Sequence, residues 1–217
     1  MGVIERSIST TTHGRFITNE RDASSPILMG FHGYAESAEV EFKRLQSIEG
    51  SDEWFIVAVQ GLHRFYRRST NEVVASWMTR QDRELAIADN SAYVSAVLHA
   101  VTRNATANPT IVLSGFSQGV AMAYRCAVMD PRVHGVISLG GDVPPELDAA
   151  ALGRIPSVLL GRGDQDEWYT AAKLEEDQSR LLAAGVEVEV VHFNGGHEWS
   201  DTFRKAASRF LNSLLVR

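Results

Sequence analysis

The stretch TIVLSGFSQGVAMAYRCAVM, residues 110–129, joins two apolar runs through the pentapeptide GFSQG. The first run, TIVLS, is typical of a buried strand, and the second, VAMAYRCAVM, of a helix. Glycines on both sides of the serine allow a sharp turn between the two elements. Such a turn would hold Ser117 out of the fold, with the positive end of the helix beneath it. The same residues fit an ordinary turn, and the surrounding chain distinguishes the two readings.

Short apolar runs recur on both sides of this stretch, and longer segments with helical spacing separate them. This alternation predicts an α/β fold with a mainly parallel sheet, helices on both faces and a site at the carboxyl ends of the strands. The less regular residues 7–20 are candidates for an antiparallel hairpin at the sheet edge. The expected strands are the runs that begin at Pro26, Trp54, Thr110, Gly135, Pro156 and Val186.

Composition is that of an ordinary globular protein, with 44% hydrophobic and 22% charged residues in a chain of 217. This length suits one well-buried core, so we expect a single domain over residues 1–217. A net charge of -6 argues against a nucleic-acid partner. The basic run HRFYRR, residues 63–68, reads as a solvated loop. Cys126 lies among apolar residues, which predicts a buried, unreactive thiol and excludes an internal disulfide.

Sequence features that would indicate a membrane, a metal or a cofactor are missing from the printed chain. The N-terminus has no apolar stretch of signal-peptide length, and no run approaches a membrane span. We therefore expect a cytoplasmic protein without stable membrane anchoring. There is no H-E-x-x-H motif, cysteine pair or Walker lysine motif, so neither metal nor cofactor is expected. A homodimer is compatible with the sequence.

A serine nucleophile needs a base, and the base needs an acid that orients it. In an α/β-hydrolase arrangement both follow the serine in the chain, which leaves His192 and His197 as bases. His192 falls within the expected last strand and reads as a packed residue, whereas His197 follows Gly195-Gly196 just beyond that strand. We therefore favour His197. For the acid, the stretch GRGDQDEWY offers Asp164 and Asp166, which spacing alone does not separate.

The oxyanion of an acyl-transfer reaction needs two backbone N–H donors. One is expected from Gln118, the residue after the serine, and the other from the loop after an earlier strand. The stretch MGFHGYAES fits that loop, and we assign the second donor to Tyr34. His32 is expected to support the loop through hydrogen bonds rather than to transfer protons.

Together, FHGYAES, GFSQG, GRGDQDEWY and GGHEW resemble the phospholipase/carboxylesterase branch of the α/β-hydrolases, which includes acyl-protein thioesterases. The resemblance runs from about Pro26 to the C-terminus and implies an α/β-hydrolase fold. It also implies that the acid is Asp166. The chain departs from the family pattern at four places, where it has Arg162, Tyr169-Thr170, Val120 and the stretch Ser76-Trp77-Met78-Thr79.

This resemblance implies a serine carboxylesterase that uses Ser117, Asp166 and His197 and forms an acyl-enzyme. Its partner would be a small acyl ester or thioester; a thioesterase or lysophospholipase of the same family is the alternative. A noncatalytic binding protein that kept the fold is a further one. The short interval Gly141–Gly153 leaves no room for a lid, so we expect an open pocket for short-to-medium acyl groups. Its expected walls are Leu62, Phe65, Trp77, Trp168 and Trp199.

Overall fold

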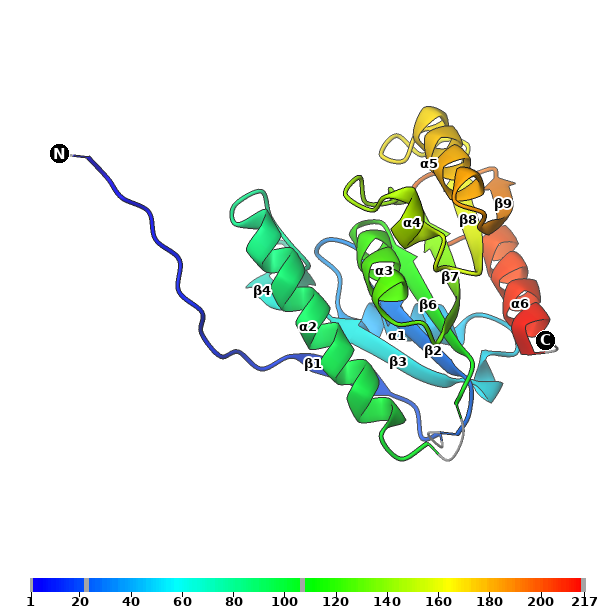
Figure 1. Cartoon of the computed structure of the whole chain (residues 1–217), viewed down its shortest axis with the longest axis horizontal. Helices are drawn as coiled ribbons and strands as arrows, with labels where there is room; N and C mark the ends of the chain where they lie inside the picture. Colours follow the sequence, from blue (N-terminus) through cyan, green and yellow to red (C-terminus); the bar gives the residue numbers. More distant parts are fainter. Residues whose placement is uncertain (1, 22–23, 106–107, 216–217) are drawn as a thin grey trace.

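A computed structural model describes residues 2–21, 24–105 and 108–215. Its centre is a seven-stranded sheet in the order β1-β3-β2-β6-β7-β8-β9 (Figure 1). Every neighbouring pair is parallel except β1 with β3. The fold is that of an α/β-hydrolase, as the sequence predicts. The strands are β1 Arg15–Thr18, β2 Ile27–Phe31, β3 Phe55–Gln60, β6 Ile111–Phe116, β7 Val133–Leu139, β8 Ser157–Gly163 and β9 Glu187–Phe193.

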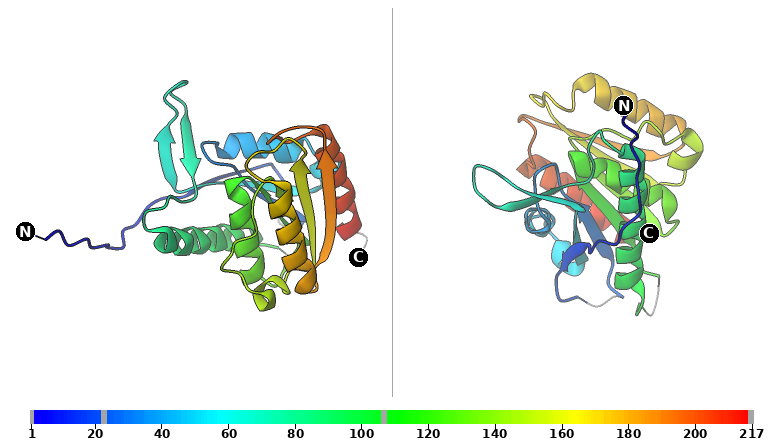
Figure 2. Two further views of the ribbon diagram at one scale, coloured as in Figure 1. Left: turned by 90° about the horizontal axis from the view of Figure 1, so that it is seen from above. Right: turned by 90° about the vertical axis from the view of Figure 1, so that its left-hand side faces the viewer.

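Helices cover both faces of the sheet (Figure 2). Residues of α2, α3, α4 and α5 pack into one apolar cluster, and residues of α1 and α6 into a second. Alternate residues of a strand point to opposite faces, and β6 illustrates this: Ile111 and Leu113 join the first cluster, Val112 and Phe116 the second. The helices are α1 Ala38–Gln46, α2 Arg83–Thr102, α3 Gln118–Met129, α4 Ala149–Leu152, α5 Ala171–Ala183 and α6 Asp201–Leu215, with a 3₁₀ turn at Ser51–Glu53.

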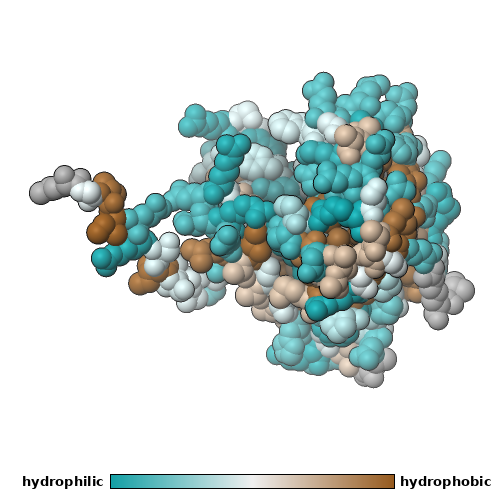
Figure 3. All heavy atoms as spheres, turned by 45° about the horizontal axis from the view of Figure 1, so that its top comes forward, coloured by the Kyte–Doolittle hydropathy of each residue, from teal (hydrophilic) through white to brown (hydrophobic). Residues whose placement is uncertain are grey.

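The N-terminal region differs from the sequence prediction. Instead of a hairpin, the sheet edge holds the single strand β1, and the residues before it form an extended segment whose N-terminal end projects from the body (Figure 1). Three apolar side chains of this segment, Val3, Ile4 and Ile8, are exposed. The part of this segment drawn in brown stands out in Figure 3 from a mostly hydrophilic face.

The loop reading of HRFYRR was also wrong, because its first four residues form a strand. A separate two-stranded ribbon consists of β4, His63–Tyr66, and β5, Val73–Ser76. The ribbon stands away from the main sheet in the left view of Figure 2. Its first strand is largely exposed and consists of two basic residues followed by two aromatic ones, so it lacks the apolar pattern of a buried strand.

The predicted burial of Cys126 is confirmed, because its thiol lies in the core. This burial raises the pKa of the thiol to about 12. At neutral pH the sulfur is therefore protonated and unreactive. Within the described part of the chain, no helix combines the length and apolar composition that a membrane span requires.

Candidate active site

Ser117 lies at the turn between β6 and α3 with a strained backbone. Its φ of 53° and ψ of -120° fall where side-chain-bearing residues are rarely found. The flanking glycines make this turn possible, because a Cβ at Gly115 would press on the backbone of Val120. A Cβ at Gly119 would overlap the carbonyl oxygen of Phe31, at the end of β2. The sharp turn that the sequence predicts therefore forms, and it packs directly against the end of β2.

Asp166 and His197 meet at the carboxyl ends of β8 and β9. The Nδ1 atom of His197 lies 2.7 Å from Oδ2 of Asp166, a carboxylate that is only 4% exposed. The other carboxylate oxygen, Oδ1, accepts hydrogen bonds of 2.9 Å from the backbone N–H groups of Trp168 and Tyr169. An ionised carboxylate only accepts hydrogen bonds, so Nδ1 carries the proton and Nε2 is left as an acceptor.

A turn after β7 places this pair close to Ser117. A Cβ at Gly140 would lie 2.9 Å from Cε1 of His197, and a Cβ at Gly141 would overlap the carbonyl oxygen of Ser117. The ring of Phe116 lies 4.9 Å from the imidazole. Ser117 and His197, both described, share no hydrogen bond, as is common before a substrate orders the groups. Gly140 and Gly141 were not predicted as site residues from the sequence; Gly140 has a φ of +66°, which a glycine adopts without strain.

The alternative residues lie elsewhere. Asp164 and His192 have side chains that are 57% and 53% exposed, and Nδ1 of His192 lies 3.7 Å from Oδ1 of Asp164. His192 is therefore not packed, contrary to the sequence interpretation. The edge strand β9 leaves one side of this position open to solvent.

Backbone donors for an oxyanion are available at the expected loop. In the turn after β2, the N–H of Gly33 donates to Glu36 Oε2, that of Ala35 to the carbonyl of Ala75, and that of Glu36 to the carbonyl of Gly33. Among the described residues, the N–H of Tyr34 has no such acceptor. The N–H of Gln118, in the first turn of α3, is likewise unpaired. Gly119 packs against the carbonyl of His32, so the two free donors lie on adjoining segments.

Hydrogen bonds from His32 support this loop, as the sequence predicts. Its Nε2 accepts from the N–H of Gly61 at 3.0 Å, and its Nδ1 lies 2.6 Å from the carbonyl oxygen of Gly33. Burial lowers the pKa of His32, which favours the neutral ring with a proton on Nδ1. The indole N–H of Trp77 donates to the carbonyl of His32 at 2.8 Å.

The side chain of Gln118 ties a further segment to the turn. Its Oε1 accepts from the backbone N–H of Trp77 at 2.9 Å and from the Ser76 hydroxyl at 3.1 Å. Its Nε2 donates to the carbonyl of Met78 at 3.1 Å. The stretch Ser76-Trp77-Met78, one of the departures from the family pattern, thus fixes the first residue of α3.

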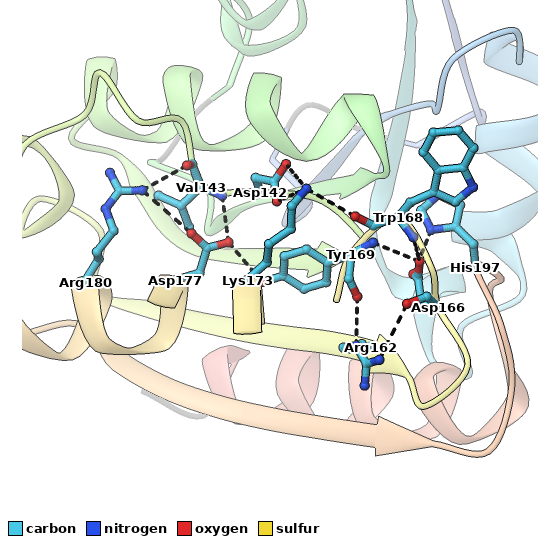
Figure 4. A network of polar contacts seen from close by, with 10 residues as sticks. All are labelled: Asp142, Val143, Arg162, Asp166, Trp168, Tyr169, Lys173, Asp177, Arg180 and His197. Carbon is cyan, nitrogen blue, oxygen red and sulfur yellow. Dashed lines mark hydrogen bonds and ion pairs between the residues drawn. The ribbon is translucent and has the colours of Figure 1, made fainter. Parts of the chain in front are cut away.

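Arg162, another departure, holds the loop that carries Asp166 (Figure 4). Its Nε donates to the carbonyl of Tyr169 at 2.8 Å, and Nη2 reaches the carbonyls of Asp164 at 3.2 Å and Asp166 at 3.5 Å. A guanidinium can satisfy several carbonyls at once because its donors form a planar fork. The residue therefore fixes the loop from inside the fold.

From Tyr169 the network continues to Asp177 on α5 (Figure 4). The Tyr169 hydroxyl donates to Asp177 Oδ2 at 3.0 Å, and the same oxygen accepts from the N–H of Val143 at 3.0 Å. Arg180 donates to the carbonyl of Val143 at 3.0 Å. Burial raises the pKa of Asp177 to about 6, despite these donors and the nearby guanidinium.

This raised pKa predicts a pH-dependent stability. Between the ordinary aspartate pKa and about 6 the folded chain keeps a proton on Asp177 that the unfolded chain has lost, so the contribution to stability decreases as pH rises. From about pH 4 to pH 7, we expect the free energy of unfolding of the wild type to fall by up to about 3 kcal/mol relative to Asp177→Asn. Urea unfolding at each pH measures this difference. For Asp89→Asn, at an exposed position on α2, the free energy of unfolding should change with pH as it does in the wild type. The same pH dependence for Asp177→Asn would contradict the prediction.

A cleft of about 350 Å³ opens beside Ser117. Aromatic, proline and charged residues surround it, and the charged ones come from separate helices and loops. These charged walls were not predicted from the sequence. The lining residues are Met78, Arg83, Ser117, Gln118, Ala121, Arg125, Gly140, Gly141, Asp142, Pro144, Pro145, Trp168, Tyr169 and Lys173.

Of the five wall residues expected from the sequence, only Trp168 lines this cleft, with 76% of its surface exposed. Trp77 is buried against Phe31 and His32. The other three lie in different surroundings. Leu62 borders a separate hollow beside the N-terminal segment, Phe65 packs against Tyr34, and Trp199 packs against Phe203.

Solved structures with the same fold include several esterases. Esterase PE8 is 22% identical, with 93% of this chain and 98% of the other covered and a TM-score of 0.68. The Bacillus cereus carboxylesterase is 18% identical, with 93% of this chain and 94% of the other covered and a TM-score of 0.69. Zea mays acyl-protein thioesterase 2 is 16% identical, with 94% of this chain and 100% of the other covered and a TM-score of 0.72. A search of curated proteins found no match.

The sequence profile of the phospholipase/carboxylesterase family matches residues 13–215, which include all strands of the sheet and every site residue described above. The match therefore does not rest on the serine turn alone. The chain belongs to the phospholipase/carboxylesterase family and is an ester hydrolase of the α/β-hydrolase fold.

Proposed function

We propose that this chain is a serine carboxylesterase in which Ser117 is the nucleophile, His197 the general base and acid, and Asp166 the residue that orients the imidazole. The 2.7 Å contact between a buried Asp166 and His197, beside the strained Ser117 turn, carries the proposal. A carboxylate held by two backbone donors fixes one ring nitrogen, so the other can accept a proton.

The reaction proceeds in two halves. Ser117 Oγ attacks the ester carbonyl while His197 Nε2 takes its proton, and the N–H groups of Tyr34 and Gln118 bind the oxyanion. The tetrahedral intermediate collapses, the C–O bond to the alcohol breaks, and the imidazolium protonates the departing oxygen. Water, deprotonated by His197, then attacks the acyl-enzyme and releases the acid and the free serine.

An active-site label tests the nucleophile directly. A fluorophosphonate probe should form a bond to Ser117 Oγ, and peptide mapping by mass spectrometry should find the label on the GFSQG peptide. Ser117→Ala should remove the label, and Ser179→Ala, at an exposed position on α5, should keep it. A label on another serine would refute the proposed role of Ser117.

Acyl-chain preference should follow from the open cleft. Between β7 and α4 lies only a short loop that contains Pro144-Pro145, and it provides no roof. Each buried methylene contributes about 0.8 kcal/mol, so kcat/KM should rise with chain length until the chain leaves the wall. We expect the highest kcat/KM for acyl chains of about two to eight carbons, and no jump in rate at the critical micelle concentration of the substrate. A p-nitrophenyl ester series measures this, and interfacial activation on long chains would contradict it.

A further inference from the structure

The cleft beside Ser117 has a charge opposite to that of the whole chain. Among the described residues that line it, three are cations, namely Arg83, Arg125 and Lys173, and one, Asp142, is a carboxylate. Lys173 pairs with Asp142 at 3.1 Å, and both arginines contact Glu146. Even with Glu146 included, cations outnumber carboxylates here, whereas the chain carries a net charge of -6. A cleft with an excess of one sign of charge attracts ligands of the other sign.

Arg125 lies on the same face of α3 as the nucleophile. Ser117, Ala121 and Arg125 are spaced by four residues, so they follow one another along one side of the helix, and all three line the cleft. A rise of 1.5 Å per residue puts the ends of this row about 12 Å apart. Helical side chains lean toward the N-terminus, so Arg125 reaches back toward Ser117 across the small Ala121. The cleft therefore extends from the serine along α3 to Arg125.

The guanidinium of Arg125 is buried and only partly paired. The residue is 4% exposed; its Nε and Nη2 donate to Glu146 Oε1 at 2.8 and 2.5 Å. Its third nitrogen, Nη1, is shielded from solvent and has no hydrogen-bond partner among the described residues. Burial lowers the pKa of Arg125, but an arginine remains charged at neutral pH. A buried charged donor without an acceptor is unfavourable, and an anionic oxygen would relieve this.

We propose that the preferred substrates are esters that carry an anionic group, such as a carboxylate, a few bonds from the scissile carbonyl, and that Arg125 binds this group. Arg83 and Lys173, which are more exposed, add attraction at the rim of the cleft. The inference rests on the proposed esterase function, since it assigns the substrate class of the same site. Neutral esters are substrates as well, but poorer ones. Sites that hold a buried donor for a substrate group discriminate strongly against analogues without that group.

Two pairs of substrates test the proposal and locate the charge. Monomethyl adipate and dimethyl adipate differ in a carboxylate on the acyl side. The compounds 5-acetoxypentanoate and its methyl ester differ in a carboxylate on the alcohol side of the acetate ester. We expect the wild type to favour the charged member of at least one pair by about 10-fold or more in kcat/KM. NMR assays of product formation at constant ionic strength measure these values.

Variants at position 125 connect this preference to the guanidinium. Arg125→Met should bring the ratio of charged to neutral kcat/KM close to one, and Arg125→Lys should restore part of it. Because the ratio compares two substrates on one preparation, a loss of folded protein cancels. Arg132→Met is the matched control: Arg132 follows α3, pairs with Asp130 and is not among the residues that line the cleft, so the ratio should be unchanged.

The outcomes separate this inference from the proposed function. If Ser117 is labelled and dimethyl adipate is hydrolysed, but neither charged substrate is favoured, the inference fails and the esterase proposal stands. If no ester is hydrolysed, the esterase proposal fails, and calorimetric titration of Ser117→Ala with monomethyl adipate decides the inference. Binding that Arg125→Met removes would support it, and binding that persists unchanged, or no binding, would overturn it.

Discussion

Ser117→Ala is expected to lower kcat by about 10⁴- to 10⁶-fold on a neutral short-chain ester, because no other group can form the acyl-enzyme. His197→Ala should cause a loss of similar size, since the hydroxyl then has no base. The two effects should not add in the double variant, because groups that act as a unit lose their function together. Stopped assays with high enzyme concentration measure these residual rates.

Exposed residues of the same types serve as controls for this prediction. Ser179→Ala on α5 and His99→Ala on α2 should keep the wild-type kcat. Unfolding midpoints of all variants would show that each chain is folded. Turnover that remains within about tenfold of the wild type in Ser117→Ala or His197→Ala would refute the mechanism.

Asp166→Asn should lower kcat by about 10³- to 10⁴-fold. The amide can still accept the hydrogen bonds of Trp168 and Tyr169, which preserves the loop. Its NH₂ group, however, donates to Nδ1 of His197 and moves the imidazole proton to Nε2, where the base is needed. The kinetic loss should therefore occur in a protein of nearly unchanged stability.

Asp164→Asn is the matched control, two residues away in the same loop. Its carboxylate is mostly exposed and lies 3.7 Å from Nδ1 of His192, so we expect kcat to stay within about twofold of the wild type. Steady-state kinetics on one ester compares the two variants. The opposite ranking would mean that the orienting acid is Asp164.

Much of the fold follows from periodicity in the sequence. Strands such as β6 and β8 are buried on both faces, so their continuous apolar runs are distinctive. The ribbon of β4 and β5 escaped prediction because β4 is mostly exposed and carries charged residues. The strand β1 is short and mostly exposed as well, and its register comes from pairing with β3 rather than from an apolar pattern of its own.

The site, too, could be predicted from the sequence only in part. Ser117, Asp166 and His197 sit in local motifs at strand ends, which a sequence reader can place. The walls of the cleft depend on contacts between distant segments, for example Lys173 with Asp142. Trp77 shows the difficulty, since the same aromatic side chain suits a pocket wall and a core. For Arg125, the sequence offers only the helical spacing from Ser117 as a sign that it lies on the same side of α3. Its burial depends on tertiary packing.

The contact of Gly119 with Phe31 also bears on how this enzyme could be altered by directed evolution. Because no space exists for a Cβ there, any substitution would push the start of α3 away from the end of β2. The two N–H donors assigned to Tyr34 and Gln118 belong to those two segments, so their separation would change as well. Diversity in a mutant library is therefore better placed at Ala121, which faces the cleft between serine and arginine and whose side chain can grow without moving the backbone.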